Sequence, residues 1–389
     1  MKKYIVKIAC LVISLLDKVI PKNNDIVVFN SFPDLSDNSF ALFVHILEKY
    51  PHKKNVWLVK TLKNEKCQAI IAEFSNSNNF EIIGRDTFFG MYYYLRAKYV
   101  FFTHGIFSDA KIANKHCVVN LWHGMPLKTI GLLDNNPAIP NFKYGIANSS
   151  FYQTIMSQAF GIKKQNILIT GQPRNDLMFQ KNNCLEKLGY EHNSDKKIVL
   201  WTPTYRQSIV GDIRIDGNVS SDFPVVKSSQ LIELDEFLET INTKIIVKLH
   251  PMDILNNNVF SQYRNIKIIK KGELESVNCQ LYSLLGAVDI LLTDFSSIYV
   301  DYLLLDRPIG FVLDDFSAYS KSRGFVFDKP GEYMPGQKIA TFEQLKDFLY
   351  KTVVLNKDSF VNERQRVNKM LNNKFNNSSE ELLTLIGFG

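Results

Sequence analysis

The sequence has few cysteines, and none of them is arranged as a pair. Five cysteines are spread over 389 residues, and none belongs to a CxxC pair or to a zinc-finger spacing. Structural zinc sites and redox dithiols require such spacings, so the sequence predicts neither. Scattered cysteines of odd number are typical of reduced thiols, and we therefore expect a cytoplasmic protein.

No hydrophobic run is long enough to cross a bilayer. Residues 1–21 combine basic and apolar side chains, but the uninterrupted apolar part covers only residues 8–13 and no small-residue cleavage site follows. A spanning helix needs roughly 20 apolar residues, and a signal peptide needs a cleavage site. We expect an amphipathic helix that lies on a membrane surface or packs on the protein's own core. On a membrane its basic side would be Lys2, Lys3 and Lys7, and its apolar side Ile5, Ile8, Val12, Leu15 and Leu16.

An arginine-rich tract is also missing, although the chain is basic. The formal net charge is +7 at pH 7, which indicates attraction to a phosphate-rich substrate, an anionic membrane or nucleic acid. Nucleic acid is the weakest of the three, because neither an arginine tract nor a zinc finger is present. We therefore expect no nucleic-acid partner.

Internal repeats and low-complexity tracts are absent as well, so an ordinary globular fold is expected. The chain is 46% hydrophobic with 28 Phe and 17 Tyr, and 389 residues exceed one ordinary core. Short apolar runs alternate with helical stretches, which is typical of doubly wound α/β domains. The predicted strands cover residues 26–29, 56–59, 82–83, 99–102, 117–121, 144–147, 167–170, 197–201, 244–249, 266–269, 289–292 and 308–313. The predicted helices cover residues 40–49, 65–74, 88–96, 149–160, 229–240, 279–286 and 297–305.

A polar segment, residues 181–195, separates the two series of strands. We therefore expect Rossmann-like domains at residues 22–182 and 183–389. Two such domains facing each other across a cleft form the GT-B architecture known among glycosyltransferases. In open sheets of this kind, chemistry is located at the carboxyl ends of the strands.

The most informative stretch, residues 120–131, lies at one such strand end. His123 follows an apolar strand and is the only side chain there that titrates near neutral pH. Gly124 and Pro126 would hold the backbone around it in a fixed, non-helical shape. His123 is therefore either a positioned acid or base, or a residue packed beside Trp122.

Four later stretches repeat the pattern of a strand followed by polar side chains. They are residues 171–176, 202–206, 248–251 and 293–297. Ser296 and Ser297 open a predicted helix, whose free N–H groups attract anions, and arginines such as Arg174 and Arg206 bind phosphate with paired donors. Each stretch alone could be a helix cap, a strand end or a surface residue, but their recurrence favours a shared anion site.

Five of these motifs together resemble the CDP-glycerol glycerophosphotransferase family of teichoic acid synthesis. The motifs are WHGMPLKTIG at 122–131, GQPRND at 171–176, TPTYR at 202–206, KLHP at 248–251 and LTDFSSIYVDY at 292–302. The resemblance extends to residues 29–33, 37–38, 307–311, 322–325 and 335–337, and thus spans nearly the whole chain. Met125, Tyr205 and Phe295 depart from the family pattern, which commonly has Thr, Trp and Tyr there.

The resemblance implies transfer of a polyol phosphate from CDP-glycerol, or from CDP-ribitol, to a hydroxyl of a lipid-linked saccharide or polyol-phosphate acceptor. CMP would be released, in teichoic acid or capsule synthesis, by an enzyme peripheral on the inner face of the bacterial membrane. His123, in the acceptor-side domain, is the candidate base, and His250, in the donor-side domain, would act on the diphosphate, although these roles could be reversed. The expected phosphate-binding residues are Arg174, Thr204, Arg206, Lys248, Thr293, Ser296, Ser297 and Arg323. The expected acceptor-side residues are Trp122, Gly124 and Lys128.

A DxD pair, which would hold a nucleotide-bound divalent ion, is missing. Asp294 and Asp301 are better interpreted as a cap and a helix residue, so we expect no metal and no cofactor beyond the donor substrate. Two other functions stay open: a GT-B glycosyltransferase that uses a nucleotide sugar, and a non-catalytic protein that binds an anionic polymer or membrane.

Overall fold

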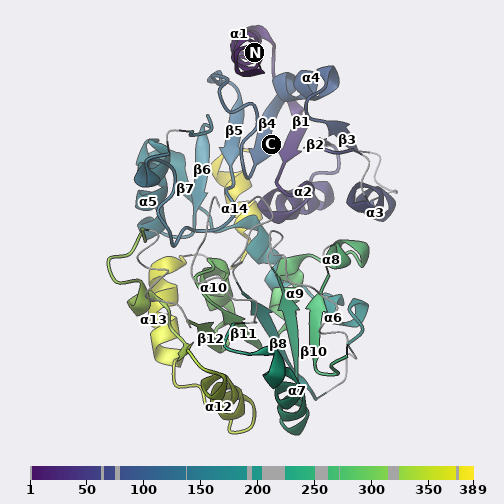
Figure 1. Ribbon diagram of the computed structural model, residues 1–389. Helices are drawn as coiled ribbons and strands as arrows, with labels where there is room; N and C mark the ends of the chain where they lie inside the picture. The colour runs from purple at the N-terminus through teal and green to yellow at the C-terminus, as the bar shows by residue number, and fades with distance from the viewer. Residues whose placement is uncertain are drawn as a thin grey trace. The chain divides into compact units, whose positions relative to one another are not determined.

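The computed structural model (Figure 1) describes residues 2–62, 65–74, 79–136, 138–190, 195–203, 224–249, 262–270, 272–313, 324–373 and 376–389. Side chains are described from Cys10 onward and, in the third helix, from Cys67. The chain forms two compact units. Unit 1 contains residues 1–125, 130–180 and 372–389, and unit 2 contains residues 126–129 and 181–371.

Unit 1 is built on a seven-stranded sheet with the order β3-β2-β1-β4-β5-β6-β7, in which every neighbouring pair is parallel. The strands are β1 (Asn23–Asn30), β2 (Lys54–Val59), β3 (Phe80–Gly84), β4 (Ala97–Phe102), β5 (Cys117–Asn120), β6 (Tyr144–Ala147) and β7 (Ile167–Ile169). Helices cover both faces, which is why the central strands read as continuous apolar runs.

The two faces of this sheet carry separate cores. Val27 and Phe29 point to a core shared with α2 (Asp37–Lys49) and with α14 (Ser378–Leu385) near the C-terminus. Ile26 and Val28 point to the opposite core, shared with α1 (Lys2–Val19) and α4 (Phe88–Arg96). The other described α-helices of unit 1 are α3 (Glu65–Glu73) and α5 (Ser150–Phe160). Ser149 caps α5 by accepting a hydrogen bond from Tyr152 N.

Unit 2 contains a six-stranded parallel sheet with the order β10-β9-β8-β11-β12-β13. Its strands are β8 (Lys197–Thr202), β9 (Thr243–Lys248), β10 (Ile266–Ile269), β11 (Ile290–Thr293), β12 (Ile309–Val312) and β13 (Gln337–Ile339). Its helices are α6 (Cys184–Lys187), α7 (Leu231–Thr240), α8 (Glu273–Ser276), α9 (Leu281–Ala287), α10 (Ile298–Tyr302), α12 (Phe342–Val353) and α13 (Val361–Leu371). The prediction of two doubly wound domains is confirmed.

The structure departs from the expected domain limits at the C-terminus. Residues 372–389 belong to unit 1, although we expected them in the second domain. The cause is apolar burial, since Leu382, Leu383 and Phe388 fill the core beneath α2. Asp176 strengthens this packing by accepting hydrogen bonds from the backbone N–H groups that begin α14, at 2.8 and 2.9 Å.

The N-terminal helix α1 is docked on unit 1 along one side. Cys10 and Ile13 are buried in the core with α4, and the carboxylate of Asp17 accepts a hydrogen bond from Ala113 N at 2.7 Å. The same carboxylate binds Lys22 at 2.5 Å and His116 at 2.8 Å. Burial alone would raise the pKa of Asp17, but these partners lower it to about 2. Among the described residues, no helix is long and apolar enough to span a bilayer.

The expectation of five reduced thiols is wrong for one pair. Cys184 and Cys279 form a disulfide in unit 2, while Cys10, Cys67 and Cys117 are buried thiols. The two partners are 95 residues apart in sequence, and only the packing of α6 against α9 brings them together. The spacing of the cysteines in the sequence does not predict this disulfide.

Candidate active site

Two histidines meet where β4 and β5 end. These strands are adjacent and pair Phe102 with Asn120, so the residues that follow them emerge at the same edge of the sheet. His104 comes two residues after β4 and His123 three residues after β5. Their rings stack with centroids 4.0 Å apart and an angle of 9° between the planes.

The surroundings of His123 define which ring nitrogen can accept a proton. Its Nδ1 lies 3.4 Å from the carbonyl oxygen of Thr103, a long contact in which only Nδ1–H can donate. The neutral ring therefore carries its lone pair on Nε2. The Trp122 ring also contacts His123, at a centroid distance of 4.1 Å, and packs against Phe160 at 4.9 Å. The acceptor-side role expected of Trp122 stays a prediction.

The loop that carries His123 has an unusual backbone shape. Trp122 has φ 50° and Gly124 has φ 131°, both in the region that side chains generally avoid. Asn120 holds the turn by accepting a hydrogen bond from Trp122 N at 2.9 Å. The buried Asn38 donates to the carbonyl oxygens of Leu121 and Trp122, both at 3.0 Å. A strained backbone fixed in this way is typical of a functional site.

Arg174 supports the same loop. Its Nη1 donates to Asp37 Oδ1 at 2.7 Å and to the carbonyl oxygen of His123 at 3.0 Å, and its backbone N donates to Asn38 at 3.1 Å. The side chain is buried within unit 1. We predicted phosphate binding for Arg174, and this placement favours a role in holding the histidine loop instead.

Electrostatics keep both histidines neutral. The pKa of His123 is lowered to about 4, mainly by loss of water around the ring and next by the nearby His104, while Asp37 opposes the shift. The pKa of His104 is also lowered, first by loss of surrounding water, although part of this side chain is exposed. At neutral pH, Nε2 of His123 is therefore free to accept a proton.

Unit 2 brings several predicted residues to one edge of its sheet. β9, β8 and β11 are neighbours, and their final residues are Lys248, Thr202 and Thr293. Lys248 is half-buried and its pKa is lowered by burial, against the opposing effect of Glu275. Ser296 and Ser297 are half-buried before α10, a helix of five residues.

Two predicted residues of unit 2 have other surroundings than expected. Thr293 is fully buried, and its hydroxyl is used within the sheet, 3.1 Å from Thr202 Oγ1 and 3.3 Å from Thr202 O. This burial corrects the prediction that Thr293 binds phosphate. Lys128, expected on the acceptor side, belongs to unit 2, where it pairs with Phe325 in an antiparallel bridge.

Other predicted residues lie outside the described part of the chain. These are His250, Thr204, Arg206 and Arg323. Asp301 is a buried helix residue that accepts a hydrogen bond from Tyr282 at 2.6 Å. Within the described ranges, no group of three or more His, Cys, Asp or Glu residues is placed to hold a metal ion.

Comparison with known proteins identifies the family. The family model for CDP-Glycerol:Poly(glycerophosphate) glycerophosphotransferase matches residues 13–387. The chain belongs to this family of glycerophosphotransferases. The motifs predict this family, whereas His104, Asp37 and Asn38 are not among the site residues predicted from the sequence. His104 could have been found, because it too follows an apolar strand directly.

Relatives within the glycerophosphotransferase family differ in substrate and length. The teichoic acid glycerol-phosphate primase of Bacillus subtilis is 26% identical over 368 residues, which cover 88% of this chain and 87% of the primase. The ribitol-phosphate polymerase TarL of Staphylococcus aureus is 24% identical over 271 residues, covering 65% of this chain but only 46% of TarL.

A solved structure shares the fold of this family member. The wall teichoic acid polymerase TagF, in a variant form soaked with CDPG, superposes with a TM-score of 0.76 at 22% sequence identity. The match covers 97% of this chain and 91% of the TagF chain. The predicted GT-B-like class of two Rossmann-like domains is thereby confirmed.

Proposed function

We propose that this chain transfers a polyol phosphate, glycerol phosphate in the first instance, from a CDP-activated donor to a hydroxyl of a lipid-linked or polymer acceptor in teichoic acid synthesis. The observation that carries the proposal is His123, a neutral histidine whose tautomer leaves Nε2 free at a strand end of unit 1. Family membership over residues 13–387 supplies the reaction type.

In the proposed step, the acceptor oxygen attacks the β-phosphorus of the CDP-polyol. The hydroxyl proton moves to Nε2 of His123 as the new P–O bond forms. The bond between the β-phosphorus and the bridging oxygen breaks, and CMP leaves with that electron pair. His123 then returns its proton to solvent. A bound phosphate near the ring would raise the pKa of His123 toward neutrality and strengthen it as a base.

The donor is proposed to bind at the strand ends of unit 2. Lys248 and Ser296 lie there, and burial of Lys248 strengthens its attraction for a phosphate by reducing the screening effect of water. We also assign donor binding to His250, Thr204, Arg206, Ser297 and Arg323, on the family resemblance alone. The reaction is proposed to need no metal.

The test is incubation with CDP-glycerol or CDP-ribitol beside a lipid-linked saccharide, with CMP release measured and product length resolved. His123→Asn should lower kcat by about 10²–10⁴-fold, the range that general base catalysis supplies. The control His52→Asn changes an exposed histidine of the same unit and should leave kcat unchanged. Product length distinguishes a primase from a polymerase.

The alternative function, a GT-B glycosyltransferase, predicts a different result in the same assay. Neither CDP-polyol would be consumed, whereas a nucleotide sugar would be. If chelation abolished CMP release, the metal-independent mechanism would be wrong. Capsule synthesis would be indicated by a capsule saccharide acting as the better acceptor.

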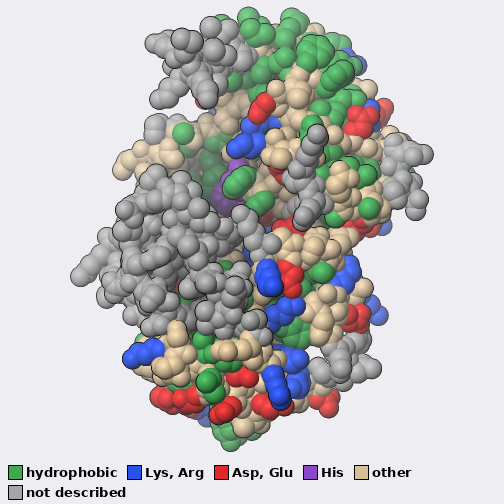
Figure 2. Space-filling model, turned by 45° about the vertical axis from the view of Figure 1, so that its right-hand side comes forward, with side chains coloured by type: hydrophobic (Ala, Val, Ile, Leu, Met, Phe, Trp, Pro, Cys, Tyr) green, Lys and Arg blue, Asp and Glu red, His purple; other side chains and the backbone are tan. Residues whose placement is uncertain are grey.

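We further propose that unit 1 rests on the inner face of the bacterial cell membrane through an apolar surface formed by α1 and α4. The helices α1 and α4 are in contact. Figure 2 shows hydrophobic side chains gathered at the upper end of unit 1, where these two helices lie. Seven side chains of this surface are between 44% and 75% exposed: Leu11, Val12, Leu15, Val19, Phe88, Phe89 and Tyr92. Exposed apolar groups gathered in this way mark an interaction site.

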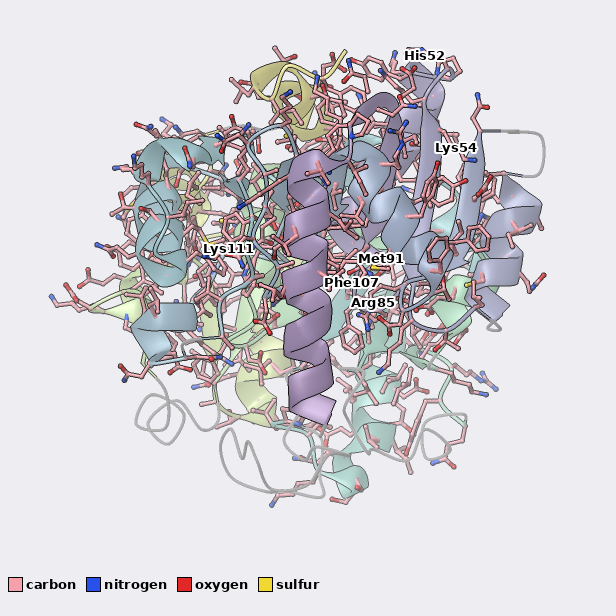
Figure 3. All side chains as sticks on the ribbon, turned by 90° about the horizontal axis from the view of Figure 1, so that it is seen from above. His52, Lys54, Arg85, Met91, Phe107 and Lys111 are labelled. Atoms are coloured by element: carbon pink, nitrogen blue, oxygen red, sulfur yellow. A yellow bond between two sulfur atoms is a disulfide. The ribbon has the colours of Figure 1, made fainter. Side chains whose placement is uncertain are left out.

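Basic residues beside this apolar surface favour an anionic bilayer as its partner. Lys18 is exposed on α1, and Lys111 and Lys115 are exposed on the neighbouring loop. Lys111 N donates to Ser14 Oγ at 2.8 Å, so this loop lies against α1 (Figure 3). Apolar side chains flanked by lysines are typical of a helix lying in a membrane interface.

Vesicle sedimentation tests the proposed membrane surface. The pair Leu11→Ser and Leu15→Ser should weaken binding to phosphatidylglycerol vesicles by about tenfold or more, because buried leucine area is lost. Phe88→Ser with Phe89→Ser should act similarly. Ile232→Ser removes an equally exposed apolar residue from unit 2 and serves as the control. Equal binding by all variants would contradict the proposed surface.

A further inference from the structure

His104 is fixed beside His123 by contacts of its own. Its Nδ1 lies 2.9 Å from Thr103 Oγ1, and the same hydroxyl oxygen accepts a hydrogen bond from Phe32 N at 3.3 Å. The Phe32 ring meets His104 edge to face, with centroids 5.5 Å apart. Residues from the ends of β1, β4 and β5 thus hold one stacked pair of imidazoles.

The stacked geometry limits what the two rings can do for each other. Parallel rings 4.0 Å apart direct their nitrogens sideways, so neither nitrogen donates a hydrogen bond to the other ring. The stack can instead exclude water from one face of His123 and fix the plane of its ring. Two protonated imidazoles at this distance repel each other, so the pair favours at most one proton.

Among the described residues, Asp37 from the start of α2 and Arg174 act electrostatically on both rings in opposite directions. They form an ion pair at 2.7 Å. These opposite charges offset each other, and after loss of water the nearby His104 is the largest influence that lowers the pKa of His123.

We propose that His104 is a positioning residue that holds the His123 ring with Nε2 toward the acceptor hydroxyl and that, when His104 is protonated at low pH, disfavours a second proton on His123. The inference rests on the proposed transferase function for its catalytic meaning. The coupling itself, in which one histidine ring orients the other, does not depend on which substrate the protein uses.

Two substitutions separate the effect of the ring from the effect of its charge. His104→Phe keeps a flat ring for stacking but cannot be protonated, whereas His104→Ala removes both. We expect His104→Ala to lower kcat by about 10–100-fold with little change in KM, because a misoriented base mainly affects the chemical step. His104→Phe should retain most of kcat at pH 8.

The pH dependence of kcat/KM distinguishes the proposed coupling from a purely structural role of His104, which would leave this dependence unchanged. In His104→Phe the acid limb of kcat/KM should shift upward by about half a pH unit or more, since a neighbouring positive charge has been removed. The control His52→Phe should keep the wild-type profile. A wild-type profile in both His104 variants would overturn the proposal, as would loss of activity in His104→Phe as complete as in His123→Asn.

Histidine ring NMR on the full-length protein makes the test independent of turnover. The His123 signal should titrate at higher pH in His104→Phe than in the wild type, because a neighbouring positive charge has been removed. Unchanged titration overturns the coupling even if the enzyme is active. If the signals are coupled but no CDP-polyol is consumed, the proposed function fails and the histidine pair stands. Should His104→Ala fail to fold, His104→Phe alone decides the result.

Discussion

The guanidinium of Arg174 joins the carboxylate of Asp37, at 2.7 Å, to the backbone oxygen of the candidate base His123, at 3.0 Å. Arg174 comes from the segment after β7 and Asp37 from the start of α2, 137 residues earlier in the chain. This ion pair anchors the loop that has the strained backbone at Trp122. The position of the loop that carries His123 therefore depends on a contact remote from it in sequence.

The first prediction concerns this ion pair. Arg174→Ala should destabilise the protein by about 3–5 kcal/mol, because it leaves a largely buried carboxylate without its partner, and should lower kcat more than it changes KM. Urea unfolding and steady-state kinetics measure the two effects. In the double variant with Asp37→Asn, part of the stability should return. No recovery would mean that the guanidinium acts mainly through the loop carbonyl.

The second prediction concerns pH and stability. His123 has a folded pKa of about 4, below its ordinary value of 6.5, so the unfolded chain binds more protons between these values. The contribution of neutral His123 to the free energy of unfolding should be complete above pH 6.5 and should decrease as the pH falls toward 4. His104 and His116, whose pKa values are also lowered, act in the same direction.

The His123→Phe variant should show a shallower decrease of unfolding free energy over this pH range, and His52→Phe should not. Urea titrations at several pH values between 4 and 7 provide the measurement. A decrease of equal slope in wild type and His123→Phe would show that His123 is not desolvated in the folded protein.

The third prediction concerns the disulfide of unit 2. Denatured protein should present three titratable thiols before reduction and five afterwards, since only Cys184 and Cys279 are joined. Replacing both with Ser should destabilise oxidised unit 2 by about 2–5 kcal/mol. If the protein purified from a reducing cytoplasm presents five thiols before reduction, the disulfide is absent in the cell.

The fourth prediction concerns Met125, where the chain departs from its family pattern. Met125 is fully buried directly after the histidine loop. Met125→Thr should cost about 1–3 kcal/mol because it buries a hydroxyl and loses apolar contacts, while kcat changes little if the residue only shapes the loop. A large loss of kcat in folded protein would assign Met125 to the acceptor site.

Most strands and many helices could be predicted from the sequence, because apolar periodicity is a local property. The strand at residues 144–147 was predicted to the residue. Elements after residue 313 were not predicted. In α12 the buried Phe342, Leu345, Phe348 and Leu349 recur at helical spacing, so this helix could have been predicted. By contrast, α13 is mostly polar, and periodicity gives a weak signal there.

The sequence by itself determined the family, the two α/β domains and the placement of His123 at a strand end. These depend on motifs and patterns that each occupy a few consecutive residues. Only the tertiary structure decided that His104 stacks on His123, that Arg174 supports the loop, that residues 372–389 complete unit 1, and that Cys184 meets Cys279. Each of these contacts depends on strand order and helix packing, which burial of apolar surface across the whole chain selects and no local pattern encodes.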